Sequence, residues 1–495
     1  MMQRLAFFAS LLLLAACGAS IPEVYTENDT LPSIYPDYVN VTVPVNIAPL
    51  TFQLDEPADA MIARYTAADN EIVCADKMQP DADDWHLLTQ QAKGGAIQVD
   101  VYARHGEQWT HYKPFTISVS PDSIDPYLSY RLIPPSFITY EAITINQRCL
   151  ENYDEHVIYD NMLCGFEHEG QCVNCHHYQQ YNPQRMQFHA RQKSGGTVIA
   201  CDGRVKKVNM ANDSILSAGV YPAWHPWQQL IVYSTDKTRQ FFHSTDPDKI
   251  EVFDLESDII AYDIDRNEVT NIENDSTEFE VFPAWAPDGK TLYYCSAHFD
   301  RQHPEVSKDR EVMSRTADLR YNIYKKAYDP DTRRFAARQP VFMADSLDKS
   351  AALPRVSPDG RYLLFTMGKY GHFHIWHHDA DLWMLDLTTA VARPLDEVNS
   401  ADTESYHSWS SNGRWVVFSS RRDDGNYTRP FFAHLRSDGR FDKPFELPAA
   451  DPDYHRQQLY SYNIPEFMRG PVTIAPQTFA DVLKGEGEPV KYVGK

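Results

Sequence analysis

The sequence predicts a mainly β protein that ends in a β-propeller of five or six blades. Three observations carry this prediction: a repeated strand–turn–strand pattern in the second half of the chain, alternating apolar and polar residues in the first third, and a Cys-rich segment between them. In order, we expect an N-terminal Ig-like β-sandwich over 41–135, a short helical segment over 136–195, the propeller over 196–475 and a tail over 476–495.

The first residues have the pattern of an export signal. Arg4 gives a positive start, and the apolar run that follows is too short to span a bilayer as a mature helix. The run ends in Leu14-Ala-Ala-Cys17, which resembles the lipobox of bacterial lipoproteins. That resemblance implies cleavage of a signal peptide, residues 1–16, and acylation of Cys17; the alternative is an ordinary secretory peptide with a coincidental cysteine.

A lipidated Cys17 would anchor the chain to a membrane, with 17–40 as a flexible tether. We therefore expect a bacterial cell-envelope protein. The residues after Cys17 include no acidic run, which favours a periplasm-facing position over a surface-exposed one.

Residues 41–135 contain short alternating runs, such as Ile97-Gln-Val-Asp-Val-Tyr102, separated by Pro- and Asp-rich breaks. This spacing is typical of antiparallel strands and favours an Ig-like sandwich. No catalytic constellation is visible there, so we expect a spacer, a docking surface or a support for the segment that follows.

That segment, 136–195, contains Cys172-Val-Asn-Cys175-His176. Two thiols three residues apart can share one face of a helical turn, where they can bind the two vinyl groups of a heme c, and His176 is placed to ligate its iron. The alternatives are a structural disulfide or a zinc site, although zinc would need remote ligands. Cys149 and Cys164, which precede the motif, could form a disulfide; the alternative is that both are ordinary buried thiols.

The heme iron can take a second axial ligand. Met186 and His189 are the leading candidates because each lies far enough beyond His176 for a loop to turn over the heme edge; His177, His156 and His168 are weaker, and an open site is also possible. Arg185 and Arg191 could pair with heme propionates, or could be solvated surface residues.

Four copies of a repeat follow, each a strand, a tight turn and an aromatic or aliphatic strand, as expected of propeller blades. The copies are Tyr221–Ser234, Phe282–Ser296, Leu353–Thr366 and Tyr406–Ser419. We expect a further, composite blade that joins strands within 197–209 to the C-terminal segment 459–464, and a tail that packs outside or frays. A histidine cluster, 372–378, is expected to be a solvated loop, with metal or heme-edge contact as the alternative.

The copies resemble the TolB-like or WD40-like (PD40) propeller repeat; the first replaces the Asp-Gly turn by Trp227-Gln228, and the fourth replaces Asp by Asn412. With the C-x-x-C-H segment, the chain resembles Bacteroidetes-type lipoproteins that combine one such cytochrome c segment with a TolB-like propeller. The resemblance implies heme attachment at Cys172 and Cys175 and ligation by His176, without implying a known reaction.

The chain has 46 basic and 69 acidic residues, a net charge of −23, which argues against nucleic-acid binding. No nucleophile elbow or nucleotide-binding glycine pattern is present. We therefore expect an electron-transfer or binding protein more than a catalyst: a membrane-anchored mono-heme c-type cytochrome that relays electrons to or from an envelope partner. The alternatives are a TolB-like interaction scaffold with a structural or sensory heme, and a heme enzyme with an open iron.

Overall fold

A computed structural model describes residues 19–76, 79–135, 142–164, 171–246 and 248–494. The predicted signal peptide and Cys17 lie outside the described residues. Among the helices of the described part, none has the length and apolar character that crossing a bilayer requires.

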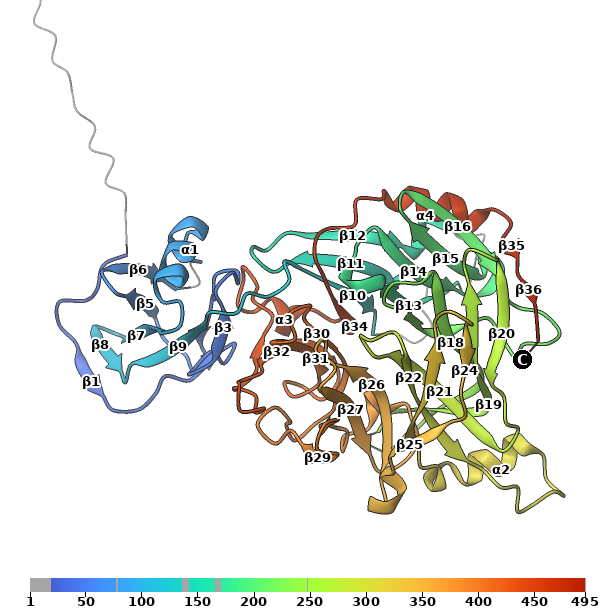
Figure 1. The fold of residues 1–495 in the computed structure, drawn as a ribbon. Helices are drawn as coiled ribbons and strands as arrows, with labels where there is room; N and C mark the ends of the chain where they lie inside the picture. Colours follow the sequence, from blue (N-terminus) through green and yellow to red (C-terminus); the bar gives the residue numbers. More distant parts are fainter. Residues whose placement is uncertain (1–18, 77–78, 136–141, 165–170, 247, 495) are drawn as a thin grey trace, which may run out of the picture.

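The N-terminal unit is one mixed seven-stranded sheet with a small two-stranded sheet and one helix (Figure 1). The large sheet contains β1 (Thr26–Asn28), β3 (Thr42–Pro44), β5 (Ala60–Ala67), β6 (Asn70–Ala75), β7 (Ala96–His105), β8 (Gln108–Tyr112) and β9 (Phe115–Ser120). The small sheet pairs β2 (Ile34–Tyr35) with β4 (Gln53–Leu54), and the helix is α1 (Ala82–Gln91).

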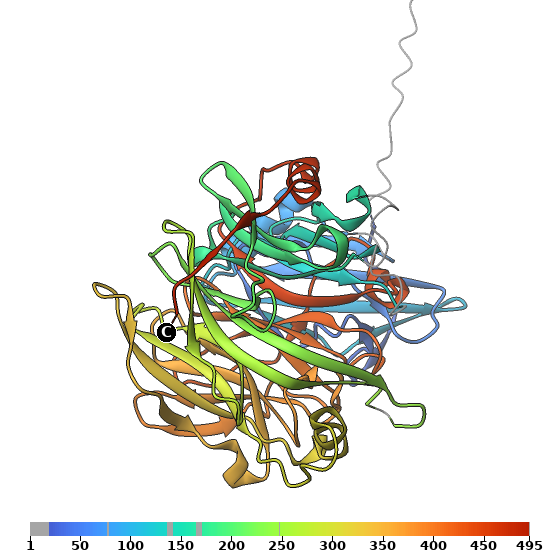
Figure 2. The ribbon, with the colours of Figure 1, turned by 90° about the vertical axis from the view of Figure 1, so that its right-hand side faces the viewer.

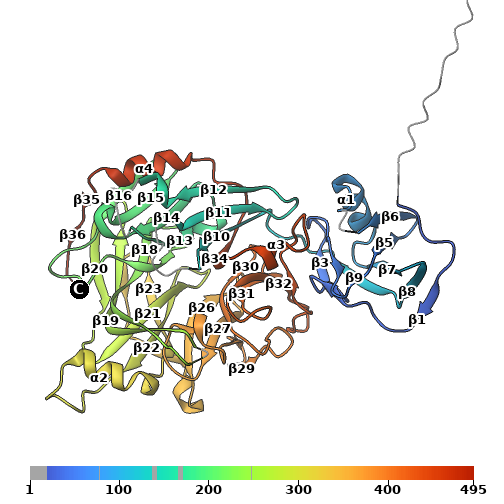
Figure 3. The ribbon, with the colours of Figure 1, turned by 180° about the vertical axis from the view of Figure 1, so that it is seen from behind.

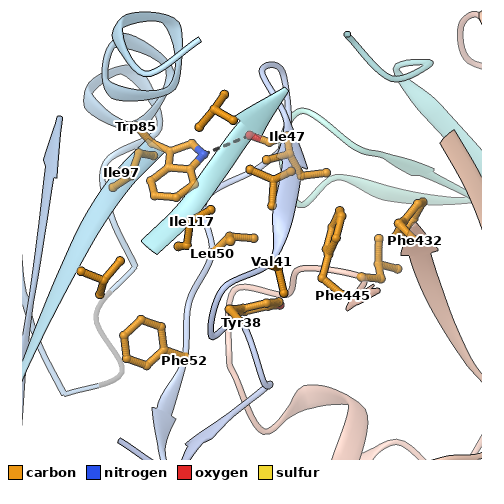
Figure 4. Close-up of a cluster of buried hydrophobic side chains, with 14 of the residues drawn as sticks. Tyr38, Val41, Ile47, Leu50, Phe52, Trp85, Ile97, Ile117, Phe432 and Phe445 are labelled. Carbon is orange, nitrogen blue, oxygen red and sulfur yellow. Dashed lines mark hydrogen bonds between the residues drawn. The ribbon is translucent and has the colours of Figure 1, made fainter. Parts of the chain in front are cut away.

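The β-rich character of this unit is as predicted, but the Ig-like sandwich is not confirmed. Helix α1, capped by the Asp81 carboxylate, buries Trp85 and Leu88 in the core of the unit. The Trp85 indole donates a 3.1 Å hydrogen bond to the Ile47 carbonyl oxygen (Figure 4). A helix therefore contributes to the core of a unit for which the sequence predicted strands alone.

The rest of the described chain forms a propeller-like arrangement of sheets (Figures 1 and 2). Four sheets stand separately as blades. The first joins β10 (Tyr127–Ile133), β11 (Thr144–Cys149), β12 (Glu155–Asp160) and β34 (Ser461–Met468). The second joins β13 (Val173–Tyr178), β14 (Arg185–Ala190), β15 (Gly196–Cys201), β16 (Arg204–Asn209) and the short β35 (Glu488–Pro489).

The two other separate blades follow the third and fourth predicted repeats. One is β26 (Ser350–Val356), β27 (Tyr362–Gly368), β28 (Asp381–Asp386) and β29 (Val391–Pro394). The other is β30 (Glu404–Trp409), β31 (Trp415–Ser420), β32 (Arg429–His434) and β33 (Phe445–Glu446).

A ten-stranded sheet holds the first two predicted repeats as two antiparallel groups. The first group is β17 (Val220–Trp224), β18 (Leu230–Phe242), β19 (Ile250–Asp263) and β20 (Glu268–Glu273), with β36 (Lys491–Tyr492) at its edge. The second is β21 (Glu278–Trp285), β22 (Thr291–His298), β23 (Asn322–Asp329), β24 (Arg334–Phe335) and β25 (Gln339–Phe342). A single parallel pairing, Ser257 with Phe279, connects β19 and β21.

The repeat turns form as predicted. Gly289, Gly360 and Gly413 have φ values of 57°, 75° and 68°, a region that favours glycine. The preceding side chains of Asp288, Asp359 and Asn412 accept backbone hydrogen bonds of 2.8–3.0 Å across the turns. Replacement of Asp by Asn412 therefore leaves the turn intact.

The prediction of short helices over 136–195 is wrong within the described residues, where β11 to β14 are strands separated by brief 3-10 turns. Strand β10 also lies in a propeller sheet, although the sequence placed it in the N-terminal unit. Its hydrogen bonds to β11 and β34 account for this placement, because they complete a four-stranded sheet.

A composite sheet between distant parts of the chain does exist, but its partners differ from those predicted. The C-terminal strand β34 pairs with β10, whereas residues 197–209 form β15 and β16 of the next sheet. Pairing the last long strand with the first sheet joins the two ends of the propeller.

The remaining helices lie outside the sheets. Helix α2 (Lys308–Ser314) belongs to the insertion after β22, α3 (Tyr454–Gln457) precedes β34, and α4 (Pro476–Lys484) packs Phe479 and Leu483 into the core of the first two blades. Figures 1 and 2 show α4 on the outer surface beside β15 and β16. The tail thus packs outside, one of its two predicted states.

The N-terminal unit and the β30–β33 blade share one hydrophobic core. Phe432, Phe445 and Trp415 of the blade belong to the same buried cluster as Tyr38 and Val41 (Figure 4). Figures 1 and 3 show the contact from both sides, with β3 close to β32 and α3. This shared core makes the N-terminal unit a fixed part of the molecule.

Candidate functional site

Among the described residues, six strands surround a common axis, each the edge strand of its group. Each contacts the next in a closed ring: β34, β13, β17, β21, β26, β30 and back to β34. Each strand has a register irregularity at a similar place. The residues there are the pairs Cys175-His176, Tyr221-Pro222, Phe282-Pro283, Leu353-Pro354, Ser405-Tyr406 and Ile464-Pro465.

These irregularities are β-bulges. In five of the six pairs the first residue has a positive φ, between 47° and 55°. A bulge leaves one residue outside the hydrogen-bond ladder, which is why proline, with no N–H to donate, is tolerated at the second position of four pairs. Cys175 and His176 therefore occupy a position that the repeat itself creates.

The C-x-x-C-H motif consequently lies in an innermost propeller strand and not on the helical turn that the sequence predicted. The pairing of β13 with β14 shifts between Asn174 and His177, and the Cys175 carbonyl oxygen accepts a 2.6 Å hydrogen bond from Gln187 Nε2. Apolar residues alternate too little in this strand for sequence periodicity to reveal it. The signal that could have revealed it is the alignment of Asn174-Cys-His-His-Tyr178 with Val220-Tyr-Pro-Ala-Trp224.

His176 lies in a small cavity of about 30 Å³ on the propeller axis, which Cys175 and the other bulge pairs also line. His176 is 1% exposed, and neither Nδ1 nor Nε2 has a side-chain partner, although the Ile464 backbone interacts with the ring. Burial lowers the pKa of His176 to about 4, so the imidazole is neutral at physiological pH. A buried imidazole without a well-formed hydrogen bond is costly, which makes His176 a candidate ligand-binding residue.

A larger cavity of about 640 Å³ lies beside the axial one, and Tyr221 and Tyr406 line both. Cys172 lines this larger cavity, at the start of β13. Its volume is in the range of small-molecule and cofactor sites. The two thiols of the motif thus border adjoining cavities.

The two candidate axial ligands have different surroundings. Met186 is fully buried and packs with Phe188 and Tyr178 in the core of its blade, and it lines neither cavity. His189 lines the large cavity. Its Nδ1 is 3.2 Å from Thr197 Oγ1, and burial lowers the pKa of the ring to about 3. The neutral His189 imidazole is therefore oriented by a second residue, as metal-binding histidines commonly are.

The weaker ligand candidates lie elsewhere. The ring of His177 is 2.9 Å from the Glu466 carboxylate, which Arg355 also contacts at 3.3 Å. His156 is exposed on β12, and His168 lies outside the described residues.

Of the two arginines proposed for propionates, Arg185 pairs with Asp202 at 2.6 Å on the surface, whereas Arg191 lines the large cavity. Arg185 is therefore a surface residue, as the alternative interpretation held.

The histidine cluster of 372–378 was expected to be solvated, but His372, His374 and His377 are buried. The His377 ring is 2.9 Å from the Glu251 carboxylate, and His374 is 2.9 Å from Thr366 Oγ1. These contacts fix the insertion against the long β18–β19 hairpin. In the described part of the chain, no group of three or more potential ligands is arranged to hold a metal ion.

The cysteines of the described residues are all free. Cys164 Sγ lies 3.2 Å from the Tyr159 hydroxyl, and the expected disulfide between Cys149 and Cys164 is not formed. The two thiols lie on different elements, at the end of β11 and in the turn after β12, with separate neighbours.

Comparison with known proteins gives no family. No protein-family model matches the sequence. No curated protein matches it either.

Solved structures with similar shape include a puromycin-hydrolyzing peptidase from Mycobacterium tuberculosis, with 12% identity and a TM-score of 0.36 over 86% of this chain and 57% of that one. A prolyl endopeptidase is 13% identical, with a TM-score of 0.36 over 65% of this chain and 43% of that one. An oligogalacturonate lyase in complex with manganese is 12% identical, with a TM-score of 0.31 over 69% of this chain and 86% of that one. The chain thus spans less than two thirds of the length of the first two. At these scores the similarities carry no functional information.

Proposed function

We propose that this chain is a mono-heme c-type cytochrome of the bacterial envelope, with the porphyrin attached to Cys172 and Cys175 beside the large cavity and with His176 as an iron ligand. The observation that carries the proposal is the buried His176 imidazole, which has no side-chain partner, beside two free thiols, one of which lines a cavity of cofactor size that adjoins the small cavity of His176. We also propose that the propeller has six blades, because the ten-stranded sheet divides into two repeats.

A heme bound in this way supplies a one-electron iron couple. The residues of the chain contribute the rest. His176 is neutral because burial lowers its pKa, and a neutral ring nitrogen is what metal ligation requires. His189 lines the cavity with Nδ1 engaged by Thr197, which makes it a better second ligand than Met186.

Both thiols of the motif are free, and burial raises the pKa of the Cys175 thiol. A zinc site would need remote ligands, and the described residues include no group of three or more potential ligands arranged to hold a metal ion.

The relay function, the lipid anchor at Cys17 and a redox partner in the envelope remain parts of this proposal. The second candidate is an interaction scaffold in which the heme is structural or sensory. The core shared by the N-terminal unit and the β30–β33 blade favours it, because it makes one rigid platform for a partner.

The test is a heme stain after denaturing electrophoresis of protein matured in a host with a cytochrome c assembly system. We expect staining of the native chain and of the control variant Cys201→Ser, whose half-buried thiol lies outside both cavities, and none of the Cys172→Ser/Cys175→Ser variant. An unstained native chain with the mass of unmodified cysteines would refute the proposal.

In stained protein, reversible reduction without CO binding supports electron relay. Failure of every envelope donor to reduce the heme, with a partner still captured, supports the scaffold. Rapid CO binding indicates an open iron and an enzyme.

A further inference from the structure

The large cavity is cationic in a strongly acidic protein. Its described lining includes three arginines, Arg131, Arg191 and Arg421, and one acidic residue, Asp236. The whole chain has a net charge of −23. A concave site with charge opposite to that of the whole protein concentrates ligands of the opposite sign, here anions.

Two of these arginines already have partners. Arg131 donates to the Val173 carbonyl oxygen at 3.0 Å and to Asn463 Oδ1 at 2.8 Å. Arg421 donates to the Ile375 carbonyl oxygen at 2.7 Å and lies over the Trp376 ring. Both guanidinium groups thus hold the cavity wall together.

Arg191 differs from them. Its backbone N–H donates to the Cys172 carbonyl oxygen at 2.9 Å, but its guanidinium has no hydrogen bond or ion pair among the described residues. Arg191 lines the cavity but is exposed, and its titratable neighbours are the two thiols of the motif, Tyr221 and Asp236. Its guanidinium therefore has donors available to a ligand or to water.

The Asp236 side chain also has a polar atom without a hydrogen-bond partner. Its backbone N–H donates to Ser217 Oγ at 2.9 Å, while its Oδ1 is buried without a partner. Burial and the charge of Asp254 raise the pKa of Asp236 well above its ordinary value, against the opposing effect of Arg191. Asp236 is therefore protonated over a wider pH range than an ordinary aspartate, and in that form it can donate a hydrogen bond.

We propose that Arg191 and Asp236 form a carboxylate-binding subsite in the large cavity. The planar guanidinium matches the two oxygens of a carboxylate, and the acid proton of Asp236 provides a further donor. The carboxylate has two sources: a free organic acid, or the side arms of the heme proposed above. The first source is independent of the proposed function, and the second rests on it.

The test for the free acid uses the Cys172→Ser/Cys175→Ser chain, titrated calorimetrically with benzoate and with its neutral isostere benzamide. Tyr221, Tyr406 and Phe373 in the cavity wall suit an aromatic probe. We expect benzoate to bind, benzamide to bind at least about tenfold more weakly, and Arg191→Gln to weaken benzoate by roughly 10- to 100-fold, as expected for a lost charged hydrogen-bond pair. The control is Arg185→Gln, which removes an arginine outside the cavity and should change benzoate binding by less than about twofold.

The test for the heme side arms uses native protein whose chain has been shown by the stain to contain heme. If they occupy the subsite, benzoate does not bind this form, and Arg191→Gln shifts the midpoint reduction potential relative to Arg185→Gln. Should Arg191→Gln fail to fold, Asp236→Asn and Arg191→Lys serve in both arms.

Binding that depends on Arg191 in the first arm supports the free acid, and a potential shift in the second supports the side arms. No Arg191 dependence in either arm overturns the subsite. If the native chain never stains, the proposed function fails, but the first arm still decides the subsite.

Discussion

Substitutions of Met186 distinguish between two roles for this side chain, core packing and iron ligation. The side chain is 0% exposed and packs with Phe188, Tyr178 and Ala200 between β13 and β15. Truncation to alanine removes most of a buried side chain and leaves a cavity, which costs about 2–5 kcal/mol of unfolding free energy. Met186→Leu keeps the volume and should cost less than about 1.5 kcal/mol.

Urea unfolding of the native chain and of the two variants measures these free energies, with unchanged m-values as the sign that only stability has moved. In stained protein we expect Met186→Leu to leave the axial-ligand absorption unchanged, whereas His189→Phe alters it. The reasoning is refuted if Met186→Leu changes the absorption, or if Met186→Ala loses less than about 0.5 kcal/mol, the range of an exposed site.

Two further predictions concern the shared core and the buried histidines. Phe432 is fully buried and stacks on Phe445, with the ring centroids 5.4 Å apart. Phe432→Ala should therefore lower the unfolding free energy by about 3–5 kcal/mol and lower the melting point of the whole molecule in one transition. The control is Leu459→Ala, at an exposed residue, and separate melting of the N-terminal unit would contradict a common core. Burial lowers the pKa of His407 from 6.5 to about 4. As the pH falls, this histidine is therefore protonated in the unfolded chain before it is protonated in the folded one. The unfolding free energy should drop by roughly 3 kcal/mol in total between pH 6.5 and 4. Over that range His407→Gln should reduce the slope of unfolding free energy against pH by about 1.4 kcal/mol per pH unit, and an unchanged slope would show that the ring titrates freely.

The repeats made the propeller predictable because each copy encodes its turn locally. Asp288-Gly289 and Asp359-Gly360 fix a positive φ and a side-chain cap within a few residues, and no distant contact is needed to read them. Strands β10 to β12 lack this turn chemistry. They become a blade only through pairing with β34, more than 300 residues away along the chain, and local pattern contains no trace of such a partner.

The site was harder to predict than the fold. The identity of Cys172, Cys175 and His176 as a unit is visible in the sequence, but their conformation depends on a bulge that the ring of inner strands imposes. His372 and His377 are buried in contact with Asp254 and Glu251 of β19, so a polar, aromatic-rich loop had no local feature to distinguish it from a solvated one. Arg185 and Arg191 are similar in sequence context, and only the position of Asp202 separates the paired from the unpaired guanidinium.

The repeat also contains an internal comparison for His176. His407 of β30 directly follows the bulge pair Ser405-Tyr406, pairs with Phe418 in the ladder and is also buried. Its two ring nitrogens lie 3.0 Å from the Ser405 carbonyl oxygen and 3.3 Å from the Leu364 carbonyl oxygen, so the fold accounts for a histidine at that position. Burial lowers the pKa of both rings, but His176 lies within its bulge and neither of its ring nitrogens has a side-chain partner. Four of the six strands place proline at the second bulge position, so that position does not require an imidazole. Under the proposal above, iron ligation would account for the imidazole of His176.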